Sequence, residues 1–272
     1  MPTDLLANFR RLDTAALAAD HGVEFEKAAA ADLVINSLGP ILEVASLAQS
    51  SASWSKFAKE RLPRHIATPL RNARKSPLQT FTCNQAEQAA GFMCLDAVSA
   101  DAFRPALLAF DTEARRMMKF KRNGSQTKGL VCGAVGEMLD NVFEHSGAPR
   151  TGIVGFLGTP EYLDISVSDA GMGVMASLRQ NPAYAYLSDA GMALALAVRD
   201  GTSRFSTTAD GEGRGHGFST LFRGLNSLDA EIRLRSGDYS LEVSGKALME
   251  RAPTISQKAR LPGLVVTFRT YF

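Results

Sequence analysis

The clearest pattern in the chain lies between residues 129 and 147, where apolar and polar side chains separate onto two faces of one predicted helix. Glu137, Asn141 and His145 are spaced four apart, so they form a polar stripe about two turns long. Gly147 is suited to end the helix. Apolar residues recur at intervals of three and four on another face: Leu130, Val131, Ala134, Val135, Met138, Leu139 and Val142. One face is therefore expected to pack, and the polar stripe is either a solvated flank or a chemical surface.

Two strands are predicted directly after this helix. Residues 151–158 and 162–169 are separated by a short turn, and the second strand alternates apolar with polar residues. This strand runs into the sequence Asp169-Ala-Gly-Met-Gly173. About forty residues later, the glycine-rich stretch 211–217 opens a predicted amphipathic helix whose apolar edge is Phe218, Leu221, Phe222 and Leu225.

The last third of the chain is expected to complete a sheet. A hairpin is predicted around Gly237-Asp238, and residues 264–271 are predicted to form a final strand after Pro262-Gly263. The strands together predict a four- or five-stranded, mainly antiparallel mixed sheet. With helices on one face, this is an α+β two-layer sandwich.

Residues 1–115 have mostly helical patterns and give little indication of a role. Pro40 and Pro63 interrupt these patterns, residues 77–83 are compatible with a short strand, and Asn84 is a candidate cap for a helix over 85–98. We therefore expect a mostly helical N-terminal region over 1–115 and a second domain over 116–272.

Composition and charge limit the classes of function. The chain has 272 residues with 45% hydrophobic content, enough for a full core. The formal net charge is only +2, so no global field indicates nucleic acid as a partner. The absence of a long apolar run predicts no membrane partner, and the charged first residues argue against a signal peptide, so a cytoplasmic location is expected. Three cysteines, Cys83, Cys94 and Cys132, are expected to be reduced core thiols.

Three motifs, in this order and at these distances, resemble the GHKL ATP-binding superfamily. They are the ExxxN helix with Glu137 and Asn141, the DxGxG turn that begins at Asp169, and a GxGxG loop over 213–217 that opens a helix. The superfamily comprises DNA gyrase, a class of heat-shock chaperones, histidine kinases and MutL proteins, and includes anti-sigma-factor serine kinases. The resemblance covers about residues 125–272. It implies a histidine-kinase-like ATPase domain with a Bergerat-type fold.

The resemblance also implies which residues would bind the base and phosphates of ATP. Asp169 would accept a hydrogen bond from the exocyclic amine of adenine, and Gly171 and Gly173 would leave space for the base. The backbone N–H groups of the glycine-rich loop would face the phosphates at the start of the following helix. The loop glycines are Gly213, Gly215 and Gly217.

The polar stripe would then supply the metal ligand and the catalytic group. Asn141 would give Mg²⁺ one side-chain oxygen, with water and phosphate oxygens completing the octahedron. Glu137 would lie near the γ-phosphate and polarise a water or a substrate hydroxyl. His145 would contact a phosphate.

The chain departs from the patterns of this superfamily in two places. The superfamily usually has a Gly-Thr pair near the last strand, whereas this chain has Gly263-Leu264, and Thr267 is an alternative threonine nearby. His65 lies in a sequence similar to a phosphoacceptor box, but Ile66 follows it and the Thr-Pro comes one residue early. A helix-edge histidine is therefore the default for His65.

A lid over the nucleotide is expected from residues 174–210, with Arg199 or Arg204 as candidate phosphate ligands. Three functions remain open for such a domain. It could be an ATP-hydrolysing regulatory switch, a protein kinase of the anti-sigma serine or histidine type, or a nucleotide-binding module without turnover. ATP and Mg²⁺ are the expected cofactors. An unidentified protein partner and a homodimer are both compatible with the sequence.

Overall fold

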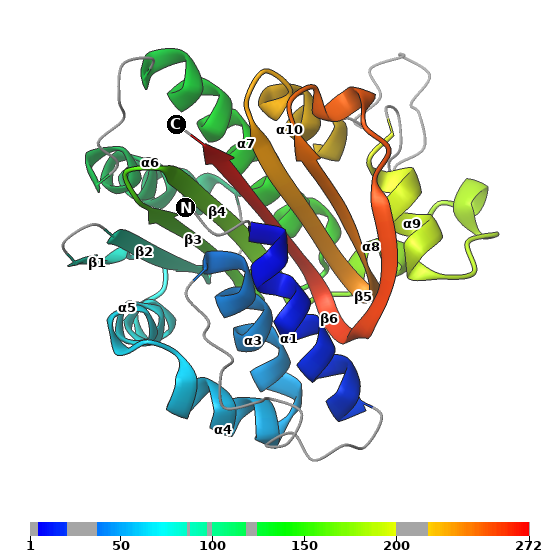
Figure 1. Ribbon diagram of the computed structural model, residues 1–272, viewed down its shortest axis with the longest axis horizontal. Coiled ribbons are helices and arrows are strands. Elements are labelled where there is room, and N and C mark those ends of the chain that lie inside the picture. The colour runs from blue at the N-terminus through cyan, green and yellow to red at the C-terminus, as the bar shows by residue number, and fades with distance from the viewer. Residues whose placement is uncertain are drawn as a thin grey trace.

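The protein has an α+β architecture built on one six-stranded antiparallel sheet (Figure 1). The computed structural model describes residues 5–20, 37–85, 88–96, 100–117, 124–199 and 217–271. The strands lie in the order β1-β2-β3-β4-β6-β5. Their bounds are β1 Phe81–Gln85, β2 Gln88–Leu95, β3 Gly152–Gly158, β4 Tyr162–Asp169, β5 Ala230–Gly245 and β6 Thr254–Tyr271.

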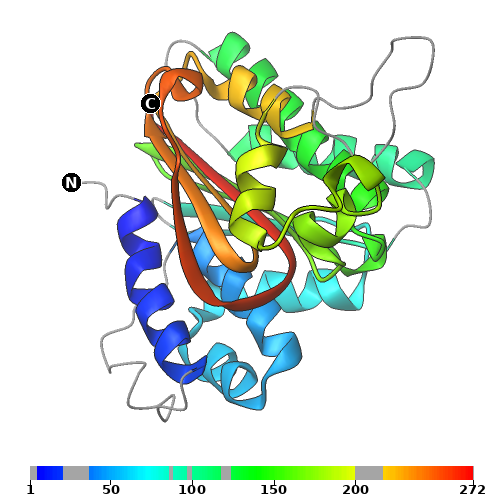
Figure 2. The same ribbon diagram turned by 90° about the vertical axis from the view of Figure 1, so that its right-hand side faces the viewer.

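Helices cover both faces of this sheet. The N-terminal helices are α1 Leu5–Asp20, α3 Leu38–Ser50, α4 Ala52–Arg61 and α5 Arg64–Lys75. The later helices are α6 Ala100–Met117, α7 Gly124–His145, α8 Gly173–Leu178, α9 Ala190–Ala197 and α10 Gly217–Leu225. Short 3₁₀ turns span Pro149–Thr151, Pro182–Tyr184 and Leu248–Glu250. Figure 2 shows α1 on one side of β5 and β6, with α8 and α9 on the other.

The sequence predicted helices on one face of the sheet, whereas the structure has helices on both faces. Helices α6 to α10 share one hydrophobic core with the sheet, and α1, α3, α4 and α5 share a second core with its opposite face. We call these the α7 face and the α3 face. Alternation along β4 assigns its side chains: Ile165 and Val167 pack in the α7-face core, whereas Ser166 is turned toward the other side.

A buried ion pair lies on the α3 face of β4 and β6. Arg269 donates two hydrogen bonds to Asp164, at 2.6 and 2.9 Å, and neither side chain is exposed to solvent. The backbone N–H of Leu38, at the start of α3, donates to the same carboxylate. The guanidinium also lies over the ring of Tyr162, 3.7 Å from its centroid. The pair therefore fixes the start of α3 against the sheet.

A second charged cluster joins α1 and α3 to β5. Arg233 forms ion pairs with Asp13 of α1, Glu43 of α3 and Glu242 of β5. Its guanidinium lies 4.2 Å from the ring centroid of Phe9. Because the arginine is buried, each of its partners offsets part of the cost of removing the charge from water.

The helix predicted over residues 85–98 is wrong. The chain forms the β1–β2 hairpin there, and β2 pairs with β3 along its length from Ala89↔Gly158 to Leu95↔Gly152. The alanines and methionine of β2 are typical of helices. However, seven consecutive residues of this strand are buried, because β2 is an inner strand with helices on both faces.

The hairpin predicted around Gly237-Asp238 is also wrong. β5 continues through this point and pairs with β6 on both sides of it, with a register shift at Gly237. Gly237 has φ +59°, and Gly263 on β6 has φ +70°. The two glycines permit a bulge and a bend in long strands where the sequence suggested turns. The last strand accordingly begins at Thr254, before Pro262.

The expected boundary between residues 115 and 116 falls inside α6. Strands β1 and β2, which precede it, belong to the same sheet as β3 to β6. Among the described residues, no helix is long and apolar enough to cross a membrane.

The two cysteines whose side chains are described both have free thiols. Cys94 is buried as expected, and burial raises the pKa of its thiol to about 11. Cys83 is only half-buried, on the edge strand β1.

Candidate functional site

Asp169 is the last residue of β4 and lies on the α7 face, two positions after the core residue Val167. Its side chain is buried at 3% relative exposure. One carboxylate oxygen accepts a hydrogen bond from the backbone N–H of Gly171, at 2.8 Å. Burial raises the pKa of Asp169 to about 6, although the N–H groups of Gly171 and Leu264 oppose the shift. A buried carboxylate with a raised pKa therefore ends β4 on the α7 face.

The loop after Asp169 is fixed to the end of α7. Met172 N–H donates to the carbonyl of Ser146 at 2.8 Å, and Ala170 N–H donates to the Thr151 hydroxyl at 2.9 Å. A Cβ atom on Gly171 would lie 2.1 Å from the Ser146 carbonyl oxygen. The loop therefore needs glycine at this position to approach α7, and the contact brings the end of β4 beside the end of the polar stripe.

Gly173 is required by its backbone conformation and by a neighbouring serine. It has φ +76°, and a Cβ atom there would lie 2.8 Å from the Ser236 hydroxyl. Ser236 accepts a hydrogen bond from Val174 N–H at 3.0 Å and donates to the carbonyl of Gly263 at 2.8 Å. The start of α8 is thus joined to β5 and β6. Protein atoms, rather than open space, occupy the positions that Cβ atoms on Gly171 and Gly173 would take.

Gly263 lets β6 pass directly behind Asp169. A Cβ atom on Gly263 would lie 2.1 Å from the carbonyl oxygen of Asp169. Thr267, the alternative to the missing threonine, is on the other face of the same strand. It hydrogen-bonds to Ser166 at 2.8 Å and lies against Gly39 of α3. It therefore cannot replace a threonine on the α7 face.

The polar stripe is present on α7 as the spacing predicts. Asn141 is 9% exposed, and its side-chain amide donates to the backbone carbonyl of Glu137 at 2.9 Å. That bond fixes the rotamer and directs the amide oxygen away from the helix backbone. Glu137 and His145 are half-buried on the same helix. Gly147, with φ +70°, follows the end of α7, which confirms its predicted position after the helix.

The glycine-rich loop is described only at its last residue. Gly217 begins α10, which packs against α7 (Figure 1), whereas Gly213 and Gly215 lie outside the described residues. The apolar edge predicted for this helix is confirmed, because the side chains of Phe218, Leu221, Phe222 and Leu225 are buried in the α7-face core.

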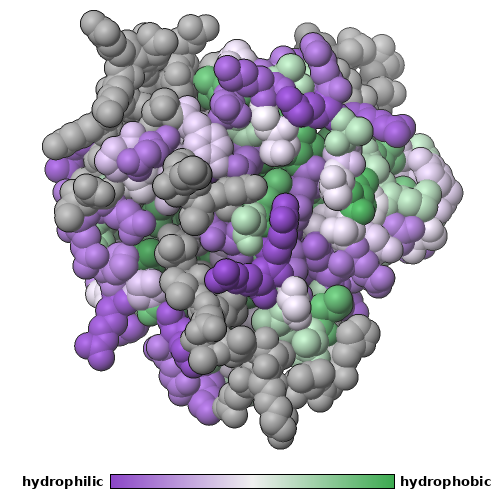
Figure 3. Space-filling view, in the orientation of Figure 1, coloured by the Kyte–Doolittle hydropathy of each residue, from purple (hydrophilic) through white to green (hydrophobic). Residues whose placement is uncertain are grey.

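The first part of the expected lid is packed on the sheet. Helix α9 begins at Ala190, and the carboxylate of the preceding Asp189 caps it by accepting from Met192 N–H at 2.8 Å. Leu194 is fully buried, and Arg199 after the helix is exposed. Arg204 lies outside the described residues. Met172, Tyr186 and Met192 are exposed, and Figure 3 shows apolar surface on the right, over α9.

Sequence reasoning missed the residues that hold this site together. Ser146, Thr151 and Ser236 bind backbone groups of the loop and of α8, yet single serines and threonines carry no motif. The one available signal was the glycine that follows Ser236, which marks an irregular strand.

Comparisons with known protein families, with curated proteins and with solved structures gave no match.

Proposed function

We propose that the end of β4 and the polar stripe of α7 bind ATP with Mg²⁺, and that the protein is an ATP-hydrolysing regulatory switch of the GHKL type. The observation that supports this most is the burial of Asp169 beside the loop that follows β4 and contacts the end of α7. Burying a carboxylate costs free energy unless a bound partner compensates for the lost hydration. Titratable groups whose pKa is shifted by burial are frequent at functional sites.

Asp169 would recognise adenine through its exocyclic amine. As a carboxylate it only accepts hydrogen bonds, so it fits the amino group of adenine and opposes the carbonyl that guanine has at the same position. The glycine turn around it is held by backbone contacts on both sides, which would present the carboxylate in one orientation.

The residues present fit a magnesium ion held mainly by the nucleotide. Mg²⁺ prefers oxygen ligands and keeps several waters, so one amide oxygen from Asn141 with phosphate oxygens is a suitable set. When bound, the ion would neutralise charge on the phosphates. Glu137, one turn earlier on α7, would accept a proton from the attacking water.

A nucleotide-binding module without turnover is the second candidate. The side chain of Thr267 faces α3, so this residue does not supply the threonine with which related folds are expected to close the adenine pocket. Weaker binding without catalysis would be compatible with that loss. A protein kinase would use the same Glu137 to activate a hydroxyl of a protein substrate.

Calorimetry on the full chain with ATP, with and without Mg²⁺, tests the shared part of these proposals. No binding at millimolar ATP would overturn them. Gamma-labelled ATP then separates the functions: a hydrolysing switch releases labelled phosphate, a kinase transfers label to protein, and a binding module does neither.

A further inference from the structure

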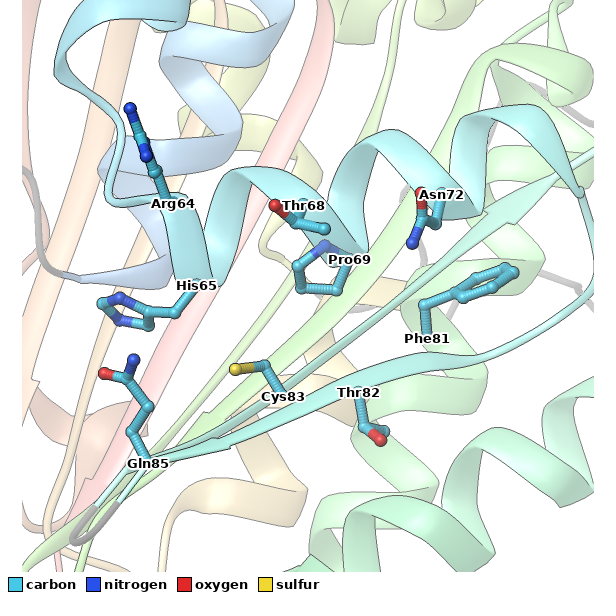
Figure 4. A pocket seen from close by; sticks show the side chains of 9 residues that line it. All are labelled: Arg64, His65, Thr68, Pro69, Asn72, Phe81, Thr82, Cys83 and Gln85. Carbon is cyan, nitrogen blue, oxygen red and sulfur yellow. The ribbon is translucent and has the colours of Figure 1, made fainter.

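A cavity of about 400 Å³, lined by polar and apolar side chains, lies between α5 and the edge strand β1 (Figure 4). Its polar lining includes Arg64, His65, Thr68 and Asn72 from α5, and Thr82 and Gln85 from β1. Pro69 and Phe81 add apolar surface. The size is within the usual range of ligand pockets. It is separate from Asp169, because β2 and β3 lie between β1 and β4 in the sheet.

The cavity is part of a groove in which helix and strand run in opposite directions. Figure 4 shows His65 near Gln85 at one end and Asn72 near Phe81 at the other. β1 is the terminal strand of the sheet and pairs only with β2 among the described residues. Thr82 is exposed on it. The outer edge of β1 therefore offers backbone N–H and C=O groups to another strand.

The groove is bordered by positive charge. Arg64, Arg71 and Lys75 are exposed and, with Thr68, follow the spacing of one helix face. None of the three has an ion-pair partner within the described parts of the chain. Residues 56–75 contain seven basic side chains and one acidic side chain, Glu60, whereas the whole chain has a net charge of only +2. Figure 3 shows hydrophilic surface at the left, over α5.

The cavity also contains a hydrogen-bonding atom without a partner. His65 Nε2 is buried and makes no hydrogen bond to any described residue. Leaving such an atom unpaired costs free energy, which a ligand that hydrogen-bonds to it would recover. Among the described residues that line the cavity none is acidic, so none of these side chains supplies a counter-charge to Arg64.

We propose that this groove binds an extended acidic peptide segment of a partner protein, which adds to the sheet as a strand beside β1. The five residues of β1 span about 17 Å, and the rise from Arg64 to Lys75 along α5 is about the same. Acidic side chains at every second position of the peptide would face the basic stripe. The intervening side chains would point to the opposite face of the sheet, because successive residues of a strand alternate between faces.

Strand addition explains more of the groove than binding of nucleic acid does. Nucleic acid would need the positive charges alone, and its affinity would rest on phosphate contacts. It would leave the backbone groups at the outer edge of β1 without partners.

Fluorescence anisotropy on the full chain tests the proposal with labelled peptides. The probes are five-residue peptides with Glu at alternate positions and Val, Leu, Phe or Thr between them. The controls are the same peptides with Lys in place of Glu, peptides with Pro in place of the intervening residues, and a labelled oligothymidine. We expect binding only of the Glu peptides that lack proline, because lysine and the oligothymidine do not complement the groove and proline removes backbone N–H groups that a paired strand needs.

Arg71→Glu should weaken acidic-peptide binding by about tenfold or more, because it places a negative charge beside the peptide. Lys246→Glu, a matched reversal on the exposed turn after β5, should leave binding unchanged. Circular dichroism confirms that both variants fold. Equal binding of the proline peptides, tighter binding of the oligothymidine, or no binding by any acidic peptide at millimolar concentration would each overturn the proposal. Asp169→Asn should not affect peptide binding, so the test is independent of the proposed ATP site.

Discussion

At the scale of single residues, Asp169 places stability and binding in opposition. Its folded pKa of about 6 exceeds the ordinary value of 3.8, so protonation favours the folded protein between these values. Above pH 6 the ionised carboxylate reduces stability, and the difference corresponds to about 3 kcal/mol. A residue that costs so much when charged is expected to contribute to function.

We therefore expect Asp169→Asn to stabilise the free protein at pH 8 by about 1–2 kcal/mol. The amide removes the buried charge, and its oxygen can still accept a hydrogen bond from Gly171 N–H. Its NH₂ group cannot accept the hydrogen bond that Leu264 N–H donates to the carboxylate, which reduces the gain. Urea unfolding at pH 8 and pH 5 measures the effect. The gain should shrink at pH 5, where the wild-type carboxyl is mostly protonated, and a loss of stability at pH 8 would contradict the assigned cost.

The same substitution should weaken ATP binding by about 1.5–3 kcal/mol, the scale of a hydrogen bond with a charged group in a closed pocket. GTP binding should change much less, because guanine lacks the amine. Calorimetry with both nucleotides gives the comparison. Equal losses would show that Asp169 does not contact the base.

Glu137 and Asn141 should respond differently to substitution, although they lie one turn apart on α7. Glu137→Gln should keep ATP affinity within a few fold and lower turnover by about 100-fold, the usual contribution of a positioned base. Asn141→Ala should weaken binding itself, and mainly when Mg²⁺ is present. Titrations with and without Mg²⁺, combined with phosphate release, separate the two. A similar loss of binding in both variants would remove Glu137 from the catalytic role.

The polar stripe of α7 and the end of β4 could be predicted from the sequence, because their positions follow from the periodicity of side chains in helices and strands. Asn141 and Asp169 are fixed in this way. Ser236 could not be predicted, because its contacts with Val174 and Gly263 join segments far apart in the chain. Local sequence patterns contain no information on such tertiary contacts.

At the scale of secondary-structure elements, α1 is held to the sheet by charge as well as by apolar contact. Asp13 pairs with Arg233 at 2.5 Å and with Lys258 at 2.8 Å. Burial acts to raise the pKa of Asp13, but the two cations more than offset it and hold the pKa below its ordinary value. A lowered pKa means that the ionised group stabilises the folded state above pH 3.8 and loses this effect as the pH falls through the folded pKa.

Asp13→Asn should therefore loosen α1 at neutral pH, because Arg233 keeps its charge and loses one partner. Hydrogen exchange should show faster exchange over residues 5–20, by roughly 5- to 150-fold for a loss of about 1–3 kcal/mol. Asp96→Asn is the matched control, since Asp96 pairs with Arg150 at the surface over 3.6 Å. Unchanged exchange in α1 would show that apolar packing alone holds the helix.

The two wrong element predictions have one cause. For β2, burial between helices on both faces outweighed the helical preference of its residues. For β5 and β6, pairing of the strands with each other turned glycine positions that resemble turns into a bulge and a bend. In both cases distant chain segments decided the structure, whereas the amphipathic helices α7 and α10 follow from their own sequence.

At the scale of the whole molecule, the sheet connects two regions that the sequence suggested were separate. The α7 face carries the proposed nucleotide site, and the α3 face carries buried charges that need α1 and α3 as partners. The polar residues Arg233, Arg269 and Asp164 are at most 1% exposed. Without the N-terminal helices these charges and the apolar residues around them would face water.

Residues 116–272 alone should consequently fail to form a stable fold. The truncation removes β1 and β2, so β3 becomes an unprotected edge, and it uncovers Ile153, Leu157 and Val265 on the α3 face. It also leaves Arg233 without Asp13 and Glu43, an uncompensated charge that typically costs about 3–5 kcal/mol when it stays buried.

The comparison of full-length and truncated protein by circular dichroism, thermal unfolding and ATP calorimetry tests this expectation. Full-length protein should unfold in one cooperative transition and carry all ATP binding, whereas the truncated chain should aggregate or lack a transition. Adding residues 1–115 in trans gives a further measurement: restored folding would show that the α3 face recognises the N-terminal region as a separate unit. A truncated chain that folds cooperatively and binds ATP as the full chain does would instead show that the N-terminal region is an independent attachment, with the shared sheet contributing little to stability.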